Sequence, residues 1–246
     1  MTKLLHLFLL IILLSLSGCQ KSDTNIAVVD SINVKLKTEA LTKEKQQNLT
    51  TDEIVNQFQQ GNDRFLKKLS IYPNYLEQVK QTATQGQFPK AVILSCIDSR
   101  APVEAIFDKT IGDLFTSRVA GNYADSGVIG GIEFACMVSG AKVIFVMGHT
   151  DCGAIKGACD NVELGNLTYV VEKIRPAVDS VKGFENERNS KNKKFVEEVT
   201  RMNVVLTMEK LRSQSSIITD LEKQGKVKII GAIYHLDDGK VDFLNH

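Results

Sequence analysis

The sequence predicts an α/β fold with a mostly parallel central β-sheet flanked by helices. Short apolar runs suited to buried strands alternate along the chain with longer segments of helical periodicity. The clearest strand candidate is the segment 142–148, which contains the run Val-Ile-Phe-Val-Met. A length of 246 residues, 43% of them hydrophobic and 24% charged, is sufficient for one globular domain with a sizeable core.

Each element follows from a local pattern. The tripeptide 51–53, Thr-Asp-Glu, is typical of a helix start, and apolar residues with partly helical spacing continue to Leu69. Pro73 and Gly86 bound a second short helix over 74–84. The remaining expected elements are strands 91–95, 113–119, 142–148 and 227–234, helices 127–139, 168–181 and 191–212, a helical stretch near Ile155, and a return over 241–243.

The N-terminal segment has the layout of a secretory signal. Lys3 precedes an apolar run over 4–14, and small residues then lead to Cys19. The run is shorter than the ~20 apolar residues that span a bilayer. The residues Leu-Ser-Gly-Cys at 16–19 resemble the bacterial lipobox, in which the cysteine is lipidated. An ordinary cleaved signal and an uncleaved anchor are the alternatives.

These features predict three parts: a lipoprotein signal peptide over 1–19, a flexible tether over 20–48 and a folded domain over 49–246. Acylation would anchor the protein in a membrane without a spanning helix. We therefore expect an exported lipoprotein that faces the periplasm or the cell exterior.

The charge balance argues against a nucleic-acid-binding protein, and the cysteines raise the question of disulfides. Lys and Arg number 30 against 29 Asp and Glu, so no excess of cations supports nucleic-acid binding. An exported chain invites disulfides among its remaining four cysteines. Cys136 lies in an apolar run, where a buried thiol is the default, and the redox states of Cys136 and Cys159 stay open.

The other two cysteines lie where a metal site is expected. Cys96 follows the strand 91–95, and His149 and Cys152 follow the strand 142–148; ligands bind at such strand ends in open α/β sheets. Two thiolates and one imidazole match the Cys₂His set of catalytic zinc sites, with a fourth position for water. Thiolates favour zinc over hard cations such as magnesium. We expect one Zn²⁺ per chain; the alternative is two buried thiols and a structural histidine.

Asp98 and Arg100 suggest a functional pair beside Cys96. The carboxylate of Asp98 can accept a proton or a hydrogen bond from metal-bound water, or swing in as a fourth ligand in a closed form. The Arg100 guanidinium can hold that carboxylate ionised and turned away from the metal. The alternative is a surface ion pair of little consequence.

The two clusters resemble the paired signatures of β-class carbonic anhydrases. The first is Cys96-Ile-Asp-Ser-Arg100 and the second is His149-Thr-Asp-Cys152-Gly153. The similarity is strong over 87–157 and looser over 231–241. It implies a β-carbonic anhydrase-like fold, zinc ligation by the two cysteines and the histidine, a gating dyad of the aspartate and arginine, and bicarbonate binding by the Gly153 backbone N–H.

The resemblance also implies a substrate site. Gln87 matches the family's active-site glutamine, and Phe115 and Phe134 match its apolar pocket. Arg118 matches the arginine of an inhibitory bicarbonate site that needs a tryptophan, and this chain has no Trp, so a structural or interface role is expected. The departures from the family pattern are Ile97 and Ala120, where a small and a bulkier residue are usual.

The function expected from this resemblance is reversible hydration of carbon dioxide to bicarbonate and a proton by zinc-bound hydroxide. The alternatives are a hydrolase of carbon disulfide or carbonyl sulfide on the same scaffold, and a non-catalytic zinc- or bicarbonate-binding lipoprotein. The resemblance further implies a homodimer or a higher even oligomer, with the helix over 52–69 embracing the partner.

Overall fold

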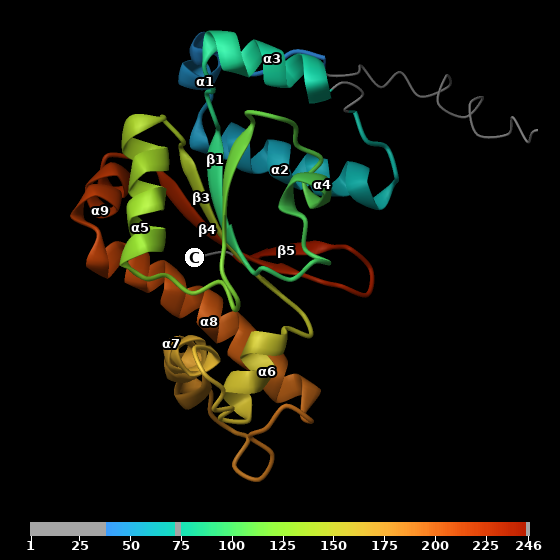
Figure 1. The fold of residues 1–246 in the computed structure, drawn as a ribbon, viewed down its shortest axis with the longest axis vertical. Coiled ribbons are helices and arrows are strands. Elements are labelled where there is room, and N and C mark those ends of the chain that lie inside the picture. The colour runs from blue at the N-terminus through green and yellow to red at the C-terminus, as the bar shows by residue number, and fades with distance from the viewer. Residues whose placement is uncertain (1–37, 72–74, 245–246) are drawn as a thin grey trace, which may run out of the picture. The chain divides into compact units, whose positions relative to one another are not determined.

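The computed structural model describes residues 38–71 and 75–244, within which five strands form one sheet in the order β2-β1-β3-β4-β5 (Figure 1). The pairs β1–β2, β1–β3 and β3–β4 are parallel, and β5 joins antiparallel at the edge. The predicted α/β fold with a mostly parallel sheet is thus confirmed. The strands are β1 Ala91–Ser95, β2 Leu114–Arg118, β3 Val143–His149, β4 Lys228–Tyr234 and β5 Val241–Leu244.

Helices cover both faces of this sheet, which explains the unbroken apolar runs of the central strands. Every residue of β1 and β3 is buried, as expected for parallel strands between helical layers. Successive side chains alternate between faces, so Ile93 and Phe145 pack toward α2 and α4, while Leu94 and Val146 pack toward α5 and α8. The two helical layers are visible on opposite sides of the sheet in Figure 1.

Four of the longer helices expected from the sequence are present in the described residues. The helices expected over 51–69, 74–84, 168–181 and 191–212 are present, the first of them ending at Leu66. The described helices are α1 Lys43–Asn48, α2 Thr51–Leu66, α3 Tyr75–Gln85, α4 Val103–Ile106, α5 Ser126–Glu133, α6 Gly153–Cys159, α7 Leu167–Ser180, α8 Lys193–Gln214 and α9 Ser216–Lys223, with a π-helix over Phe134–Val138. None of these helices is both long enough and apolar enough to cross a membrane.

A capping box begins α2, and its removal should weaken the fold measurably. The Thr50 hydroxyl accepts the Glu53 backbone N–H, and the Glu53 carboxylate accepts the Thr50 N–H. We expect Thr50→Ala to lower the free energy of unfolding by about 1 kcal/mol in urea titrations, because the Glu53 N–H loses its side-chain acceptor. Thr51→Ala, one position inside the helix, is the control and should not destabilise. Equal stabilities of the two variants would contradict this account.

The predicted tether over 20–48 needs correction at its C-terminal end. Residues 43–48 form α1, begun by a Thr42 cap, and Leu41 is buried. The Gln46 side chain is buried and donates to the carbonyls of Pro89 and Ser139. Because α1 is attached by polar contacts rather than an apolar stripe, hydrophobic periodicity gave no sign of it. The folded body therefore begins before residue 49.

The helix expected over 127–139 changes type before it ends. It is α-helical through Glu133 and continues as a π-helix over Phe134–Val138, where the Ser139 N–H donates to the Phe134 carbonyl. Hydrophobic periodicity does not distinguish the two types. The short α4 and the α9 helix were not expected from the sequence at all.

A third apolar cluster lies beyond the carboxyl ends of the strands. It joins Cys96 and Cys152 to residues of α6, α7 and α8, including Ile155, Ile174 and Phe195, all of which are buried. Figure 1 shows these three helices below the end of the sheet. The carboxyl edge is thereby closed from solvent on one side, and this is where the candidate site lies.

Candidate metal centre

The sheet register brings the three predicted metal ligands together. Cys96 directly follows β1, and His149 is the last residue of β3. Because β1 and β3 are adjacent and parallel, their carboxyl ends meet at one edge. The chain then turns after His149, and Cys152 becomes the N-cap of α6.

The ligand atoms of Cys96, His149 and Cys152 all lie within 4.8 Å of one another. All three residues are buried, with exposed fractions of 4%, 1% and 1%. The two sulfurs are 3.9 Å apart. Two thiolates on a tetrahedral zinc ion with Zn–S bonds of ~2.3 Å lie ~3.8 Å apart, so the observed sulfur separation fits this metal.

The imidazole of His149 is oriented for metal binding. Its Nδ1 lies 2.8 Å from the Thr150 carbonyl oxygen, which makes Nδ1 the protonated nitrogen and leaves Nε2 with a lone pair. Nε2 is buried and has no hydrogen-bond partner among the described residues. A buried polar atom without a partner is costly, and coordination of a metal would satisfy it. The donor set and its geometry therefore fit zinc.

The pKa values of the two thiols are shifted in opposite directions. The Cys152 side chain hydrogen bonds to Cys96 and holds the pKa of Cys96 well below its usual value, while the same contact raises the pKa of Cys152. The Gly121 backbone N–H also donates to Cys96 Sγ at 3.4 Å. Since metal ligands must be deprotonated, binding of zinc to this pair releases a proton, and its affinity rises with pH.

Asp98 and Arg100 form the predicted pair beside the ligands. Arg100 Nε and Nη2 donate to the two carboxylate oxygens of Asp98 at 3.0 and 2.8 Å, and the Arg100 backbone N–H donates at 2.9 Å. The Arg100 side chain holds the pKa of Asp98 far below its usual range, against the effect of burial. Asp98 Oδ2 lies 3.8 Å from His149 Nε2, so the carboxylate faces the metal position while its oxygens are held by arginine.

Arg118 and Gly121 also support the centre; a structural or interface role was expected for Arg118, and no role was expected for Gly121. Arg118 Nε donates to the Cys96 carbonyl at 2.9 Å and Nη2 to the Asp98 carbonyl at 2.5 Å. The structural role expected for Arg118 is therefore confirmed. Gly121 has φ +76°, and a Cβ there would lie 2.5 Å from Ile174 Cδ1. Arg118 joins β2 to the loop after β1, and Gly121 packs against Ile174 on α7. No local motif encodes contacts between such distant segments.

The residues predicted for the substrate site are only partly brought together. Phe115 and Phe134 meet with ring centroids 6.2 Å apart. Gly153 is the exposed first residue of α6, so its N–H is one of the helix donors without an intrahelical partner. Gln87 is exposed before β1, at the opposite end of a strand ~17 Å long from Cys96. Within one chain Gln87 therefore does not reach the metal cluster, because the length of β1 separates them.

Comparison with known proteins agrees with this geometry. A family model described as carbonic anhydrase matches residues 91–241, which is more than half of the chain and includes all three candidate ligands. The chain belongs to the carbonic anhydrase family. This carbonic anhydrase is 34% identical to carbonic anhydrase 2 of Mycobacterium tuberculosis over 192 residues, which cover 76% of this chain and 89% of the relative. It is 30% identical to a carbonic anhydrase of Pseudomonas aeruginosa over 190 residues, covering 74% of this chain and 86% of the relative.

Solved structures assign the carbonic anhydrase to the β class. The crystal structure of a β-carbonic anhydrase from Aspergillus fumigatus superposes with a TM-score of 0.60 at 27% identity, covering 69% of this chain and 81% of that one. A β-carbonic anhydrase of Coccomyxa in complex with acetazolamide shares the fold, with a TM-score of 0.59 at 18% identity, covering 78% of this chain and 82% of that one. The fold, the family and the enzyme class expected from the sequence are thus confirmed.

Proposed function

We propose that this carbonic anhydrase holds one Zn²⁺ per chain through Cys96, His149 and Cys152 and reversibly hydrates carbon dioxide to bicarbonate and a proton. The observation that carries the proposal is the buried Nε2 of His149, which has no hydrogen-bond partner among the described residues and lies with two sulfurs in a cluster whose ligand atoms are within 4.8 Å of one another. Nothing in the site or the comparisons favours carbon disulfide or carbonyl sulfide as the substrate.

The residues around the ligands divide the work of the reaction. When bound, zinc would lower the pKa of water at the fourth position to about 7 and so supply a nucleophile near neutral pH. Asp98 stays ionised, and Arg100 keeps its carboxylate oxygens from taking that fourth position. The ionised Asp98 can accept the proton of a bound water through a hydrogen bond and orient it. Arg118 fixes the backbone that carries Asp98 and Cys96.

Substrate binding is proposed for the start of α6 and for an apolar pair of phenylalanines on β2 and the π-helix. The Gly153 N–H, at the start of α6, would donate to a bicarbonate oxygen, since helix N-termini favour anions. Phe115, on β2, and Phe134, on the π-helix, form an apolar pair that would offer carbon dioxide a non-polar surface. Gln87 could contribute only from another copy of the chain, which links this assignment to the oligomer proposed below.

The test of the proposed function is zinc content and stopped-flow hydration of carbon dioxide on the same sample of protein lacking residues 1–19. We expect about one zinc per chain and a rate that rises with pH through neutrality, because the bound water must ionise before it attacks. As the pH is lowered, the rate of an Asp98→Ala variant should fall by a smaller factor than that of wild type, because the variant has no carboxylate to occupy the fourth position. Bound zinc without hydration at any pH would contradict the proposal and favour a binding protein or another substrate.

Export and lipidation at Cys19 are proposed from the signal-like segment 1–19, which lies outside the described residues. A lipid on Cys19 would place the enzyme at a membrane surface facing the periplasm or the cell exterior. Metabolic labelling with a fatty acid tests this: label on the full chain, and none on Cys19→Ala, is the expected result. An unlabelled wild-type protein in the soluble fraction would overturn it.

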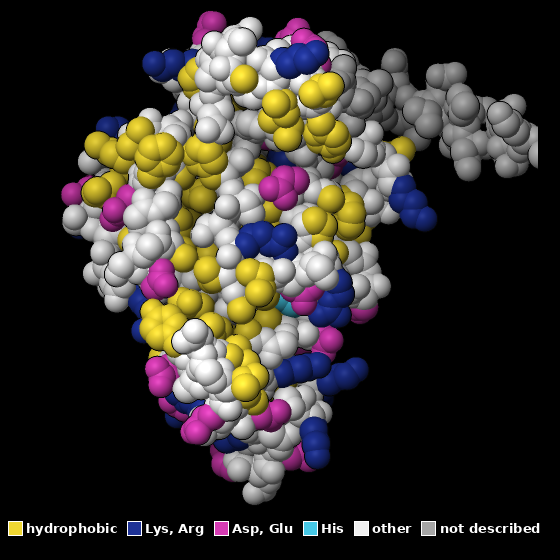
Figure 2. Space-filling view, in the orientation of Figure 1, with side chains coloured by type: hydrophobic (Ala, Val, Ile, Leu, Met, Phe, Trp, Pro, Cys, Tyr) yellow, Lys and Arg dark blue, Asp and Glu magenta, His cyan; other side chains and the backbone are white. Residues whose placement is uncertain are grey.

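A homodimer or higher even oligomer is proposed from exposed apolar surface. Phe134, Met137 and Val138 are exposed by 53%, 64% and 70% on the π-helix. Figure 2 shows hydrophobic side chains gathered over α5 on the viewed face, and such patches mark interaction sites. A structure from a study of two tetrameric β-carbonic anhydrases of Sordaria macrospora shares this fold, with a TM-score of 0.59 at 22% identity. Analytical ultracentrifugation should give an even multiple of the chain mass, and a monomer at micromolar concentration would contradict the proposal.

A further inference from the structure

Asp151 lies between two of the metal ligands, in a backbone conformation that needs support. Its φ is +58°, in the left-handed region that non-glycine residues adopt at a cost of about 1 kcal/mol or more. This conformation turns the side chain away from the buried ligands, and 56% of that side chain is exposed. Contacts of the Asp151 carboxylate with neighbouring residues can offset the cost of this conformation between His149 and Cys152.

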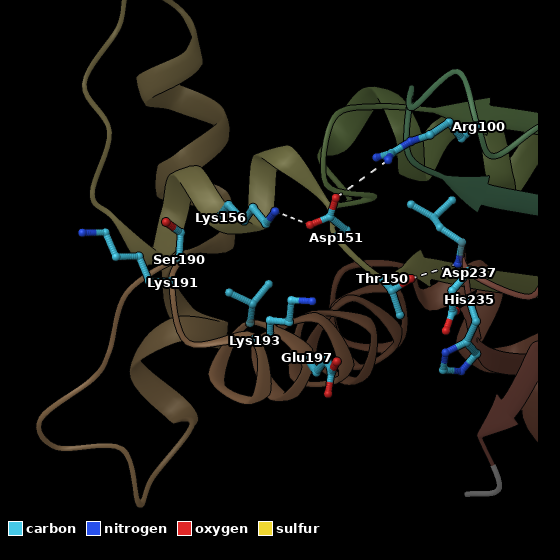
Figure 3. Close-up of a pocket in the computed structure, with 12 residues that line it drawn as sticks. Arg100, Thr150, Asp151, Lys156, Ser190, Lys191, Lys193, Glu197, His235 and Asp237 are labelled. Atoms are coloured by element: carbon cyan, nitrogen blue, oxygen red, sulfur yellow. Dashed lines mark hydrogen bonds and ion pairs between the residues drawn. The ribbon is translucent and has the colours of Figure 1, made fainter.

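Two cations from different elements make those contacts. Lys156, on α6, forms an ion pair with Asp151 Oδ1. Arg100, from the loop after β1, places Nη1 3.8 Å from Asp151 Oδ2. Figure 3 shows the Asp151 carboxylate between the arginine and the lysine, at the wall of a cavity of about 480 Å³. Asp151 thus links the loop that carries Asp98 to the last turn of α6.

Arg100 meets its two carboxylates along different edges. Nε and Nη2 are used by Asp98, while Nη1 faces Asp151. The two carboxylates therefore do not compete for the same donors. Because 52% of the Arg100 side chain is exposed, its contact with Asp98 alone would leave a long, solvated side chain with a single anchor. Asp151 supplies the second anchor on the opposite side.

We propose that Asp151 is a positioning residue for the hydration reaction: it holds Arg100 in place, and Arg100 in turn keeps Asp98 off the fourth metal position. The inference rests on the proposed function of the metal centre. It assigns a role to a residue that was given none from the sequence, where it only stands between His149 and Cys152. Loss of the Asp151 charge should free Arg100 and let Asp98 swing toward the metal more often.

The experiment compares wild type, Asp151→Asn and the surface control Asp220→Asn, each loaded with Co²⁺ for visible spectroscopy and with Zn²⁺ for hydration. Asp220 is exposed on α9. The Arg100→Gln spectrum marks the state with Asp98 released, and the Asp98→Asn spectrum marks the state without carboxylate ligation. We expect Asp151→Asn to shift toward Arg100→Gln and to lose roughly two- to fivefold in hydration rate, the range of exposed ion pairs. Asp220→Asn should match wild type.

A double substitution separates positioning from a merely structural role. In an Asp98→Asn background no carboxylate can reach the metal, so adding Asp151→Asn should leave the cobalt spectrum unchanged. A spectral change of equal size in both backgrounds would show that Asp151 only shapes the turn, and would overturn the inference. An Asp151→Asn variant identical to wild type in spectrum and rate would also overturn it.

The same measurements separate this inference from the proposed function. A wild-type protein that binds no zinc, or binds it without hydrating carbon dioxide, refutes the proposed function and the positioning role with it. An active wild type with an unaffected Asp151→Asn variant refutes the positioning role alone.

Discussion

Cys96→Ala is expected to abolish zinc retention and to reduce carbon dioxide hydration to the rate without enzyme. Cys96 is one of the three candidate ligands found among the described residues, and its sulfur is 3.9 Å from that of Cys152. Removal of a thiolate leaves a Cys-His pair, too few ligands to hold a catalytic zinc ion. Because bound zinc supplies the nucleophile, loss of the metal should remove the activity rather than weaken it. Elemental analysis after dialysis and stopped-flow hydration on the same sample measure both effects.

Cys136→Ala is the matched control for this prediction. Cys136 is a buried thiol in the apolar layer formed by α5 and α8, and burial raises its pKa to about 12. It should stay protonated and take no part in metal binding. This variant is expected to keep one zinc per chain and its activity. Retention of zinc and hydration by Cys96→Ala would contradict the assigned ligand set, and loss of zinc by both variants would indicate general damage to the fold.

Gly61→Ala is expected to destabilise the protein by about 3 kcal/mol or more, because the new methyl group would meet backbone. A Cβ at Gly61 would lie 1.8 Å from the Phe107 carbonyl oxygen and 2.7 Å from its carbon. Helix α2 therefore passes so close to the chain after α4 that only glycine fits. Side-chain rotation cannot relieve this contact, so α2 must shift, and its Phe58 contacts with Phe107 and Phe145 would be lost.

Gly157→Ala, on α6, provides the comparison. Its Cβ would meet Val162 and Val171 at 3.9 Å, an ordinary van der Waals contact. Alanine is favoured over glycine within a helix by up to ~1 kcal/mol, so this variant should be as stable as wild type or slightly more stable. Urea unfolding followed by circular dichroism measures both variants. A Gly61→Ala protein as stable as Gly157→Ala would mean that α2 and α4 are not packed at this distance.

The parts of the fold that were predicted correctly are those with a strong local signal. Strand β1 was predicted with its observed bounds, and β3 within one residue, because buried parallel strands are continuous apolar runs. Helix α1 was missed because Gln46 attaches it by hydrogen bonds to distant carbonyls. The close approach at Gly61 was missed for a similar reason: its partner, Phe107, lies far along the chain.

The cluster of Cys96, His149 and Cys152 was predicted because metal-binding residue types occur in two short motifs, each at the end of a strand. The contribution of Arg118 needed the three-dimensional structure, since it binds carbonyl groups that sequence does not distinguish. The anchoring of Arg100 by Asp151 needed the conformation of the turn. Gln87 was placed in the site by resemblance alone, and the direction of β1 within one chain sets it at the opposite end.

The separation of Cys96 and Cys152 along the chain would make a metal bound between them a reporter of folding. Cys96 and Cys152 are 56 residues apart in sequence and meet only when β1 and β3 have paired across the crossover that contains α5. In an unfolded chain the entropy of closing such a loop opposes their encounter. High-affinity capture of zinc by this cluster would therefore require the pairing of β1 with β3. A substitution that loosens β1 from β3, however distant from the ligands, should register first as weakened metal retention.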